Sequence, residues 1–351
     1  MDNIVEKSNL ETIIEIYKKL EDEQSKYIFK NRLLHSISGE SKYIKNIVNT
    51  TDYGKKFAKI FQTNEDVYIF GAGIWGKEII KIWGDNIKGV LDNNIYKIGE
   101  KINEIKIYNP REVIDDSFKG KVVIATRKYY REVLNQLLKL GLKKEQIVNI
   151  DNWISQAEDD QYFSLKELYH VNDEVFVDVG SLDAKTSVQF SKWSGEFKKI
   201  YCIEPDKENI KKCIYNISEN RLNDKTQMVK SGAWSVDGEL YINSLGNGMS
   251  CVETENNSIN CDKIKVNRLD TILKNEKVTY IKMDIEGAEL EALYGAKRII
   301  SEQRPKLAIS IYHRPEDIVE LSHLIMKYND SYKFYLRHHS IVSWDTVLYA
   351  I

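Results

Sequence analysis

The stretch from Val175 to Ser187 most constrains how this chain of 351 residues can fold. It begins with a short apolar run that breaks off at Asp178, passes Gly180 and small or polar residues, and then takes on helical character. In an open α/β sheet, the first strand ends in this way, and backbone N–H groups and a helix N-terminus then face the ligand crevice. The sequence therefore predicts a strand, a turn and a helix, with a ligand site at the turn.

The carboxylate of Asp178 restricts which ligand this turn can accept. It would repel a phosphate group placed there, whereas it would attract a cation or an amine. S-adenosylmethionine meets this requirement, because it has both a sulfonium and an amino group.

The composition excludes several classes of protein. Lys and Arg number 51 and Asp and Glu number 53, so no net field attracts nucleic acid or an anionic membrane. The chain has neither a signal-peptide pattern nor an apolar run long enough to span a bilayer, so we expect a cytoplasmic location. The four cysteines lack metal-binding or disulfide spacing and are expected to be free thiols.

The spacing of apolar residues changes twice along the chain, and the three resulting regions predict the domain organisation. Residues 1–60 have apolar side chains at helical spacing, which predicts amphipathic helices that pack on the next domain or form a homodimer interface. Residues 61–155 alternate short apolar strands with helical stretches, which predicts a small Rossmann-like α/β domain. A polar, acidic connection from Asp151 to Tyr169, with a short helix at its end, leads to a larger α/β domain over residues 165–351.

The small domain contains a glycine-rich turn. Gly71, Gly73 and Gly76 follow the apolar run Val67–Phe70, and Asp92 ends the next predicted strand about twenty residues later, as in a dinucleotide-binding fingerprint. Three interpretations stay open: a site for a nucleotide or nucleotide-linked sugar, a structural or substrate-positioning module, and an NAD(P) site.

Two later strands of the larger domain end on acidic residues. Glu204 follows an apolar strand at a place where a carboxylate can bind both hydroxyls of a ribose, although it also suits an acidic turn before a helix. The run Tyr280–Glu289 places Lys282 and Asp284 on one face of a strand by period-two alternation, so we expect them to pair beside the ligand. Glu289 could equally be a helix cap. No metal site is predicted, since Asp284 and Glu286 alone are weak evidence for one.

The next strand ends at Tyr312 and His313, and a histidine can take a proton from a hydroxyl near neutral pH. Between the strands, Glu239–Val266 alternates in polarity, which predicts an antiparallel insertion over the ligand edge. Ser250 lies at its tip, which is a candidate substrate lid.

These motifs together resemble the FkbM family of S-adenosylmethionine-dependent methyltransferases. The resemblance covers residues from about 170 to the C-terminus and depends on Asp178–Gly180, Ile203–Pro205, Ile281–Glu289 and Tyr312–His313. It implies an α/β fold with a seven-stranded Rossmann-like sheet whose last strand is antiparallel. It also implies transfer of a methyl group, usually to a hydroxyl and often on a sugar or polyketide. For this chain we expect a hydroxyl or amine acceptor on a sugar or glycan precursor.

The resemblance implies roles for individual residues. The residues expected to bind the cofactor are Asp178, Gly180, Ser181, Asp183, Glu204, Pro205 and Asp284. The residues expected to act in catalysis or to face the acceptor are Lys282, Asp284, Glu286, Ser250, Tyr312 and His313. Ala184 stands where the family commonly has glycine, and its methyl group would disfavour a positive φ at this turn.

Two other functions are compatible with the sequence. One is a non-catalytic protein that binds a nucleotide-linked sugar or glycan through its α/β units. The other is an NAD-dependent sugar oxidoreductase that uses the turn at Gly71, Gly73 and Gly76. Each of the three functions implies a small-molecule, glycan or nucleotide-linked ligand.

Overall fold

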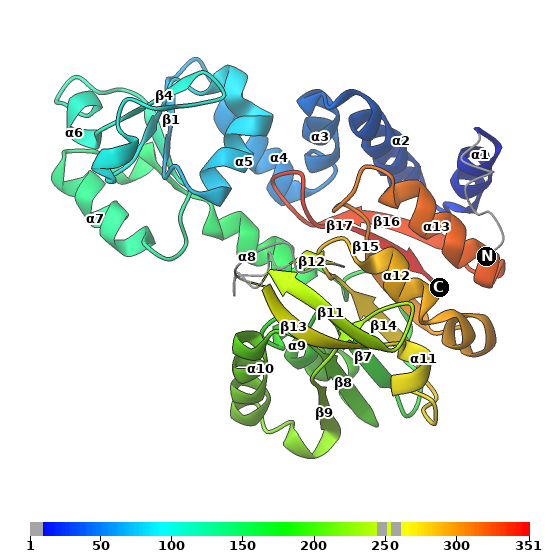
Figure 1. Cartoon of the computed structure of the whole chain (residues 1–351). Helices are drawn as coiled ribbons and strands as arrows, with labels where there is room; N and C mark the ends of the chain where they lie inside the picture. Colours follow the sequence, from blue (N-terminus) through cyan, green and yellow to red (C-terminus); the bar gives the residue numbers. More distant parts are fainter. Residues whose placement is uncertain (1–9, 244–250, 254–260) are drawn as a thin grey trace. The chain divides into compact units, whose positions relative to one another are not determined.

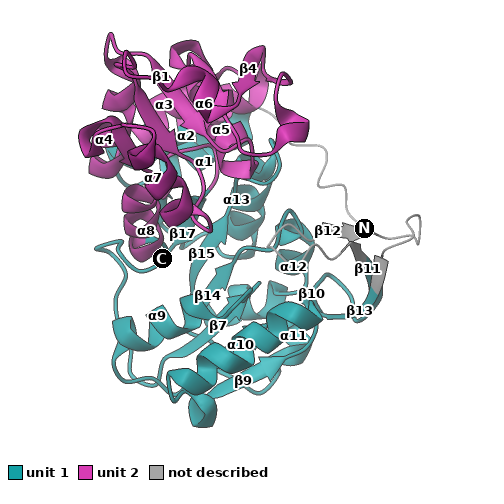
Figure 2. Cartoon of the chain, turned by 90° about the vertical axis from the view of Figure 1, so that its left-hand side faces the viewer, with its two compact units in different colours: residues 1–29, 161–337, 345–351 teal, residues 30–160, 338–344 magenta. Residues whose placement is uncertain are grey.

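The computed structural model describes residues 10–243, 251–253 and 261–351, and these form two compact units (Figure 2). The seven-stranded unit comprises residues 1–29, 161–337 and 345–351, and the six-stranded unit comprises residues 30–160 and 338–344. The predicted N-terminal helical segment is thus divided between the units, and a short C-terminal stretch belongs with the six-stranded unit. Among the helices of the described ranges, none combines the length and apolarity needed to cross a membrane.

The seven-stranded unit is built on one mixed sheet (Figure 1). In spatial order its strands are β16 (Phe334–His338), β17 (Thr346–Ala350), β15 (Lys306–Ser310), β14 (Tyr280–Met283), β7 (Val175–Val179), β8 (Lys199–Ile203) and β9 (Thr226–Val229). Neighbours from β15 to β9 are parallel, whereas β17 pairs antiparallel with β15. The predicted seven-stranded sheet with an antiparallel last strand is confirmed.

The central strands of this sheet are apolar because helices cover both of their faces. Every residue of β7, β14 and β15 is buried. Aromatic rings fill the core on one side, where Phe176 stacks on Phe190 with ring centroids 4.3 Å apart. The helices of the unit are α1 (Leu10–Lys19), α9 (Lys185–Ser194), α10 (Lys207–Glu219), α11 (Leu269–Ile272), α12 (Glu289–Tyr294) and α13 (Asp317–Tyr328).

The predicted antiparallel insertion is confirmed as a small second sheet. Its order is β10 (Gly232–Ala233), β13 (Cys261–Asn267), β11 (Gly238–Asn243) and β12 (Cys251–Glu253). Strand β11 pairs antiparallel with both β12 and β13. The proposed lid residue Ser250 lies outside the described residues.

The six-stranded unit has the predicted Rossmann-like character. Its strands in spatial order are β3 (Lys101–Ile102), β4 (Ile105–Tyr108), β2 (Gly89–Leu91), β1 (Val67–Phe70), β5 (Lys121–Ile124) and β6 (Ile147–Asn149). All pairs are parallel except β3 with β4. Its helices are most of α2 (Glu23–Ser38), then α3 (Ser41–Val48), α4 (Asp52–Ala58), α5 (Ile74–Trp83), α6 (Pro110–Val113), α7 (Tyr130–Lys139) and α8 (Asp151–Asp160).

The predicted secondary structure of the acidic connection from Asp151 to Tyr169 is wrong, because the helix lies at its start and not at its end. Residues Asp151–Asp160 form helix α8, and no helix follows between residues 161 and 174. The helix forms because Ile154 and Ala157 share one buried face at helical spacing, which the many polar neighbours obscured. Arg127 contributes ion pairs with Asp151 and Glu158, at 2.7 and 2.5 Å.

Alanine substitutions at two glycines with positive φ, one crowded and one open, can show how tightly the loop after β7 is packed. A Cβ atom at Gly180 (φ +79°) would lie 2.0 Å from the carbonyl oxygen of Asp284, whereas one at Gly195 (φ +69°) would meet no atom within 4 Å. We expect Gly180→Ala to lower the free energy of unfolding by about 3 kcal/mol, from backbone strain plus a steric clash. Gly195→Ala has the strain alone and should lower it by about 1 kcal/mol. Urea unfolding followed by tryptophan fluorescence compares the two variants, and equal losses would contradict the packing described here.

Candidate functional site

Two strained loops form the carboxyl edge of the seven-stranded sheet. The loop after β7 has positive φ at Gly180, Leu182 and Ala184, and the loop after β14 has positive φ at Glu286 and Gly287. Three of these five residues are not glycine, and each pays roughly 1–2 kcal/mol for the left-handed conformation. Such strain is concentrated at sites where backbone geometry matters for function. The pattern therefore singles out this edge as the candidate site.

Ala184 confirms that the turn requires an unusual backbone. Its φ is +61°, it is fully buried, and it immediately precedes α9. The methyl group was expected to disfavour a positive φ, but the chain keeps that conformation. The hydrogen bond from the Ala184 N–H to the carbonyl of Ser181 closes the turn.

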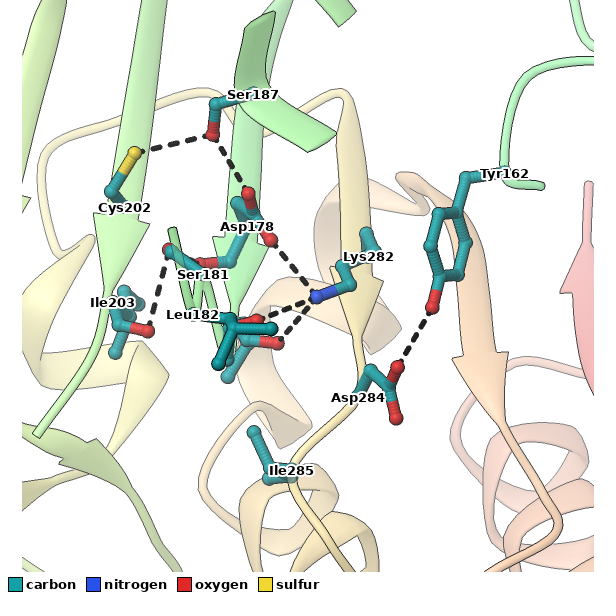
Figure 3. A network of polar contacts seen from close by, with 12 residues as sticks. Tyr162, Asp178, Ser181, Leu182, Ser187, Cys202, Ile203, Lys282, Asp284 and Ile285 are labelled. Carbon is teal, nitrogen blue, oxygen red and sulfur yellow. Dashed lines mark hydrogen bonds and ion pairs between the residues drawn. The ribbon is translucent and has the colours of Figure 1, made fainter. Parts of the chain in front are cut away.

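A buried ion pair lies beneath this loop (Figure 3). The Asp178 carboxylate has no exposed surface, lies 3.1 Å from the Lys282 Nζ, and accepts a hydrogen bond from the Ser187 hydroxyl at 2.8 Å. The expected pairing of Lys282 with Asp284 is not found. In the β7 to β14 register Lys282 stands opposite Asp178, so the lysine meets the acid of the neighbouring strand.

Lys282 also fixes the start of the loop. Its ammonium group donates to the carbonyl oxygens of Gly180, at 2.7 Å, and of Val179, at 3.4 Å. Burial acts to lower the pKa of Lys282, but the negative charges of Asp178 and Asp284 raise it above its ordinary value. Asp178 was predicted to attract a cation, and in the structure this cation is the ammonium group of Lys282. Direct contact between Asp178 and a cofactor stays a prediction.

Glu204 links the loop after β7 to the loop after β8. Its carboxylate accepts hydrogen bonds from the backbone N–H groups of Leu182, at 2.9 Å, and Asp206, at 3.0 Å. The side chain is buried, which raises its pKa. The Asn209 side chain also forms a hydrogen bond with this carboxylate, which has about four acceptor positions in all. Pro205 separates Glu204 from Asp206 in the sequence, and Asp206 is the N-cap residue of helix α10.

Ser181 and Asp183 shape the same turn. The Ser181 hydroxyl donates to the carbonyl of Asp178, and the Asp183 carboxylate accepts the N–H of Lys185. Asp183 also forms a 2.7 Å ion pair with Lys185, whose side chain is largely exposed. Ser181 and Asp183, which were predicted to bind the cofactor, therefore belong to the turn, and their side chains form hydrogen bonds with its backbone.

Asp284 lies directly after β14 and accepts hydrogen bonds from two tyrosine hydroxyls. Tyr162 donates at 2.9 Å and Tyr312 at 3.3 Å. Figure 3 shows the Tyr162 ring pointing at the carboxylate. Tyr162 was missed in the sequence because it stands in the polar connection, and only its neighbouring aromatic residue Phe163 hinted at a buried position. Burial raises the pKa of Asp284, but the charges of His313 and Lys282 hold it below its ordinary value.

His313 is surrounded by carboxylates. Its Nδ1 lies 3.0 Å from Glu289, and its Nε2 lies 3.5 Å from Asp284 and 3.6 Å from Glu286. Burial acts to lower the pKa of His313, but Glu289 and the other two carboxylates raise it to about 9. Burial also raises the pKa of Glu286 to about 7. A ring that holds its proton at neutral pH donates rather than accepts, so this arrangement does not favour the general-base role.

Glu289, for which a capping role was left open, has two contacts. One oxygen accepts the backbone N–H of Ile285 at 2.8 Å, and the same oxygen faces His313. One ligand atom each from Asp284, Glu289 and His313 lie within 4.8 Å of one another. These three residues could hold a metal ion.

The predicted nucleotide residues meet in one turn of the six-stranded unit. Gly71 has φ +117°, and a Cβ atom at Gly76 would lie 1.9 Å from the Gly71 carbonyl oxygen, so helix packing requires this glycine. A Cβ atom at Gly73 would meet nothing within 4 Å. The Asp92 carboxylate accepts the N–H of Ala72 at 2.8 Å. Only Gly73 lacks a structural reason to be glycine.

Comparisons with known proteins agree with this geometry. Residues 174–336 match the family model described as the methyltransferase FkbM domain, which confirms the predicted enzyme class and S-adenosylmethionine as methyl donor. A crystal structure of methyltransferase FkbM from Methylobacillus flagellatus KT superposes with a TM-score of 0.51 and 20% identity, covering 84% of this chain and 93% of that one, and shows the same fold. Aeropyrum pernix fibrillarin, solved with natively bound S-adenosyl-L-methionine, gives a TM-score of 0.38 and 13% identity, covering 56% of this chain and 74% of that one. No curated protein matches the chain.

The buried ion pair can be tested by removing one or both charges. Lys282→Met leaves the Asp178 carboxylate buried without a counter-charge, so we expect the free energy of unfolding to fall by about 3–5 kcal/mol. The double variant Asp178→Asn, Lys282→Met should recover at least half of that loss, because no isolated charge remains. Lys333→Met removes an exposed 3.5 Å pair with Glu21 and serves as the control, with a loss below about 0.5 kcal/mol. Urea unfolding measures all three variants, and a double variant as unstable as Lys282→Met would refute the electrostatic explanation.

Proposed function

From the FkbM methyltransferase domain at residues 174–336, we propose that this protein transfers the methyl group of S-adenosylmethionine to a hydroxyl of a sugar or glycan precursor. The observation that supports this acceptor is the polar cluster around Asp284. Its carboxylate, the hydroxyls of Tyr162 and Tyr312, and Glu286 offer the hydrogen-bonding groups that a polyhydroxylated acceptor needs.

The donor would bind across the loops after β7 and β8. Glu204 would accept hydrogen bonds from the ribose hydroxyls at the acceptor positions that its contacts within the chain leave free. The methionine part would then follow the strained turn from Gly180 to Asp183, which Lys282 holds from below. This arrangement would aim the methyl group at the loop after β14.

The reaction would be an in-line displacement. The acceptor oxygen forms a bond to the methyl carbon while the sulfur–methyl bond breaks, its electron pair stays on sulfur, and the hydroxyl proton leaves to a carboxylate. Because the sulfonium already activates the methyl group, the protein's main contribution is alignment at near-attack distance. Asp284 would orient the acceptor hydroxyl, since it lies at the edge of the loop that faces the donor.

Cofactor binding tests the donor side. We expect the full chain to bind S-adenosylhomocysteine in isothermal titration calorimetry, and Glu204→Gln to weaken that binding at least tenfold, because one ribose acceptor becomes a donor. Glu208→Gln, on the first turn of α10, is the matched control and should bind as the wild type does. Transfer of a labelled methyl group to nucleotide-linked sugars then tests the acceptor. A wild-type chain that binds neither S-adenosylmethionine nor its demethylated product would rule the proposal out.

A second ligand site is supported in the six-stranded unit. Gly73 faces open space at the end of β1, and the exposed side chains Ile95 and Tyr96 follow β2 while Tyr129 follows β5. All three strands present their carboxyl ends here, which is where α/β sheets bind ligands. We infer that this edge binds a nucleotide-linked sugar, with a ring of the ligand on the exposed tyrosines.

A single substitution tests this second site. Gly73→Val places its side chain in open space, so the fold should be unchanged while the ligand's approach is blocked. We expect the wild type to bind a uridine-diphosphate hexose in calorimetry and Gly73→Val to lose at least tenfold in affinity. Gly84→Ala, at the far end of α5, adds a Cβ that meets its nearest atom at 3.5 Å and keeps an ordinary helical φ, so it should bind as the wild type does. A change of NADH fluorescence on adding protein, with no binding of the sugar nucleotide, would favour the oxidoreductase alternative instead.

Association and location stay predictions. Leu10, with 71% of its surface exposed, and Ile37, with 75%, are the most exposed large apolar residues on α1 and α2, which supports a homodimer formed through the N-terminal helices. A cytoplasmic location is the setting in which a glycan precursor would be available.

A further inference from the structure

Three potential metal ligands converge from three different elements. Asp284 follows β14, Glu289 is the first residue of α12, and His313 follows β15. One ligand atom from each lies within 4.8 Å of the others. Because the carboxyl ends of β14 and β15 are adjacent, the fold itself holds these atoms together.

Two buried polar atoms of this cluster lack hydrogen bonds. Oε2 of Glu289 has no partner in a side chain that is 1% exposed, and Nε2 of His313 has no hydrogen bond in a side chain that is 9% exposed, whereas Nδ1 of His313 lies 3.0 Å from the other Glu289 oxygen. Buried polar atoms are nearly always paired, so orphans of this kind need an explanation. An ion bound to them would supply their missing partner.

The distances on the Nε2 side of His313 leave room for a shared ion, whereas its Nδ1 is in direct contact with Glu289. Its Nε2 lies 3.5 Å from the Asp284 oxygen, beyond good hydrogen-bond length. Two ligand atoms that each lie about 2.1 Å from one ion are separated by about 3.0 to 3.4 Å, depending on the coordination angle. Small side-chain shifts would therefore complete such a site.

The charges point the same way. The carboxylates of Asp284, Glu286 and Glu289 surround one imidazole ring, while the nearby Lys282 already pairs with Asp178. The proton on the His313 ring balances part of this negative charge, and a divalent cation would take the place of that proton when it binds the ring nitrogen. A donor set of one imidazole and two carboxylates suits borderline ions such as Mn²⁺, Fe²⁺ or Zn²⁺ better than Ca²⁺, which prefers oxygen ligands alone.

We propose that Asp284, Glu289 and His313 bind one divalent transition-metal ion at the acceptor end of the methyltransferase site. Its role, which rests on the proposed function, is to polarise the acceptor hydroxyl and ease the loss of its proton. The proton would leave to the carboxylate of Glu286 at the rim, the freed oxygen would take the methyl group, and the electron pair of the broken bond would stay on sulfur. The ion undergoes no redox change.

Manganese binding to the full chain tests this site. After treatment with a chelator, the protein is titrated with Mn²⁺ and the free ion is followed by electron paramagnetic resonance. We expect one saturable site per chain, and at least tenfold weaker binding in His313→Gln and in Glu289→Gln. Glu291→Gln, on the same helix α12, should bind as the wild type does.

A measurement on the wild type avoids variants that fail to fold. Pulsed electron paramagnetic resonance of bound Mn²⁺ should show coupling to an imidazole nitrogen. The proposal is overturned if the wild type shows no saturable binding, if the bound ion shows no nitrogen coupling, or if folded His313→Gln and Glu289→Gln bind as tightly as the wild type.

Cofactor binding separates this proposal from the proposed function. S-adenosylhomocysteine affinity is measured in the presence of the chelator. If the cofactor binds while Mn²⁺ does not, the metal site is wrong and the methyl-transfer proposal stands. If neither binds, both proposals fail.

Discussion

The ion pair between Asp178 and Lys282 is the interaction on which the candidate site depends. Both groups are buried between β7 and β14, where an isolated charge would be costly, so each requires the other. Lys282 then holds the carbonyl oxygens at the start of the strained loop, and the Leu182 N–H of the same loop donates to Glu204. The geometry of the donor side therefore follows from one charge pair beneath it.

A second set of charged and polar groups surrounds Asp284, in the part of the site where we propose that the acceptor binds. Asp284 follows Lys282 by two residues, yet it belongs to the tyrosine hydroxyls and to His313 rather than to the lysine. Lys282 pairs with Asp178, yet burial does not raise the pKa of Asp284 above its ordinary value, because the charges of His313 and Lys282 hold it down. The end of β14 therefore takes part in two sets of contacts: the ion pair beneath the loop after β7, and the cluster of carboxylates and hydroxyls around His313.

The fold and the positions of the acids could be predicted from the sequence, because strand ends show as apolar runs that break at charged residues. The period-two alternation of the strand placed Lys282 on the same face as Asp284. It could not show that the register between β14 and β7 puts this lysine opposite Asp178. Tyr162 was missed because it reaches Asp284 from 122 positions away, in a segment without any periodic pattern. The charge state of His313 depends on three carboxylates whose distances only the structure gives.

The most direct measurement is a crystal structure of the full chain with S-adenosylhomocysteine. The ribose hydroxyls should lie within hydrogen-bond distance of the Glu204 carboxylate, and the sulfur should face the loop that begins at Asp284. A cofactor whose ribose lies away from Glu204, or one that occupies the glycine-rich turn at Gly73 instead, would contradict the assignment of donor and acceptor sides made here.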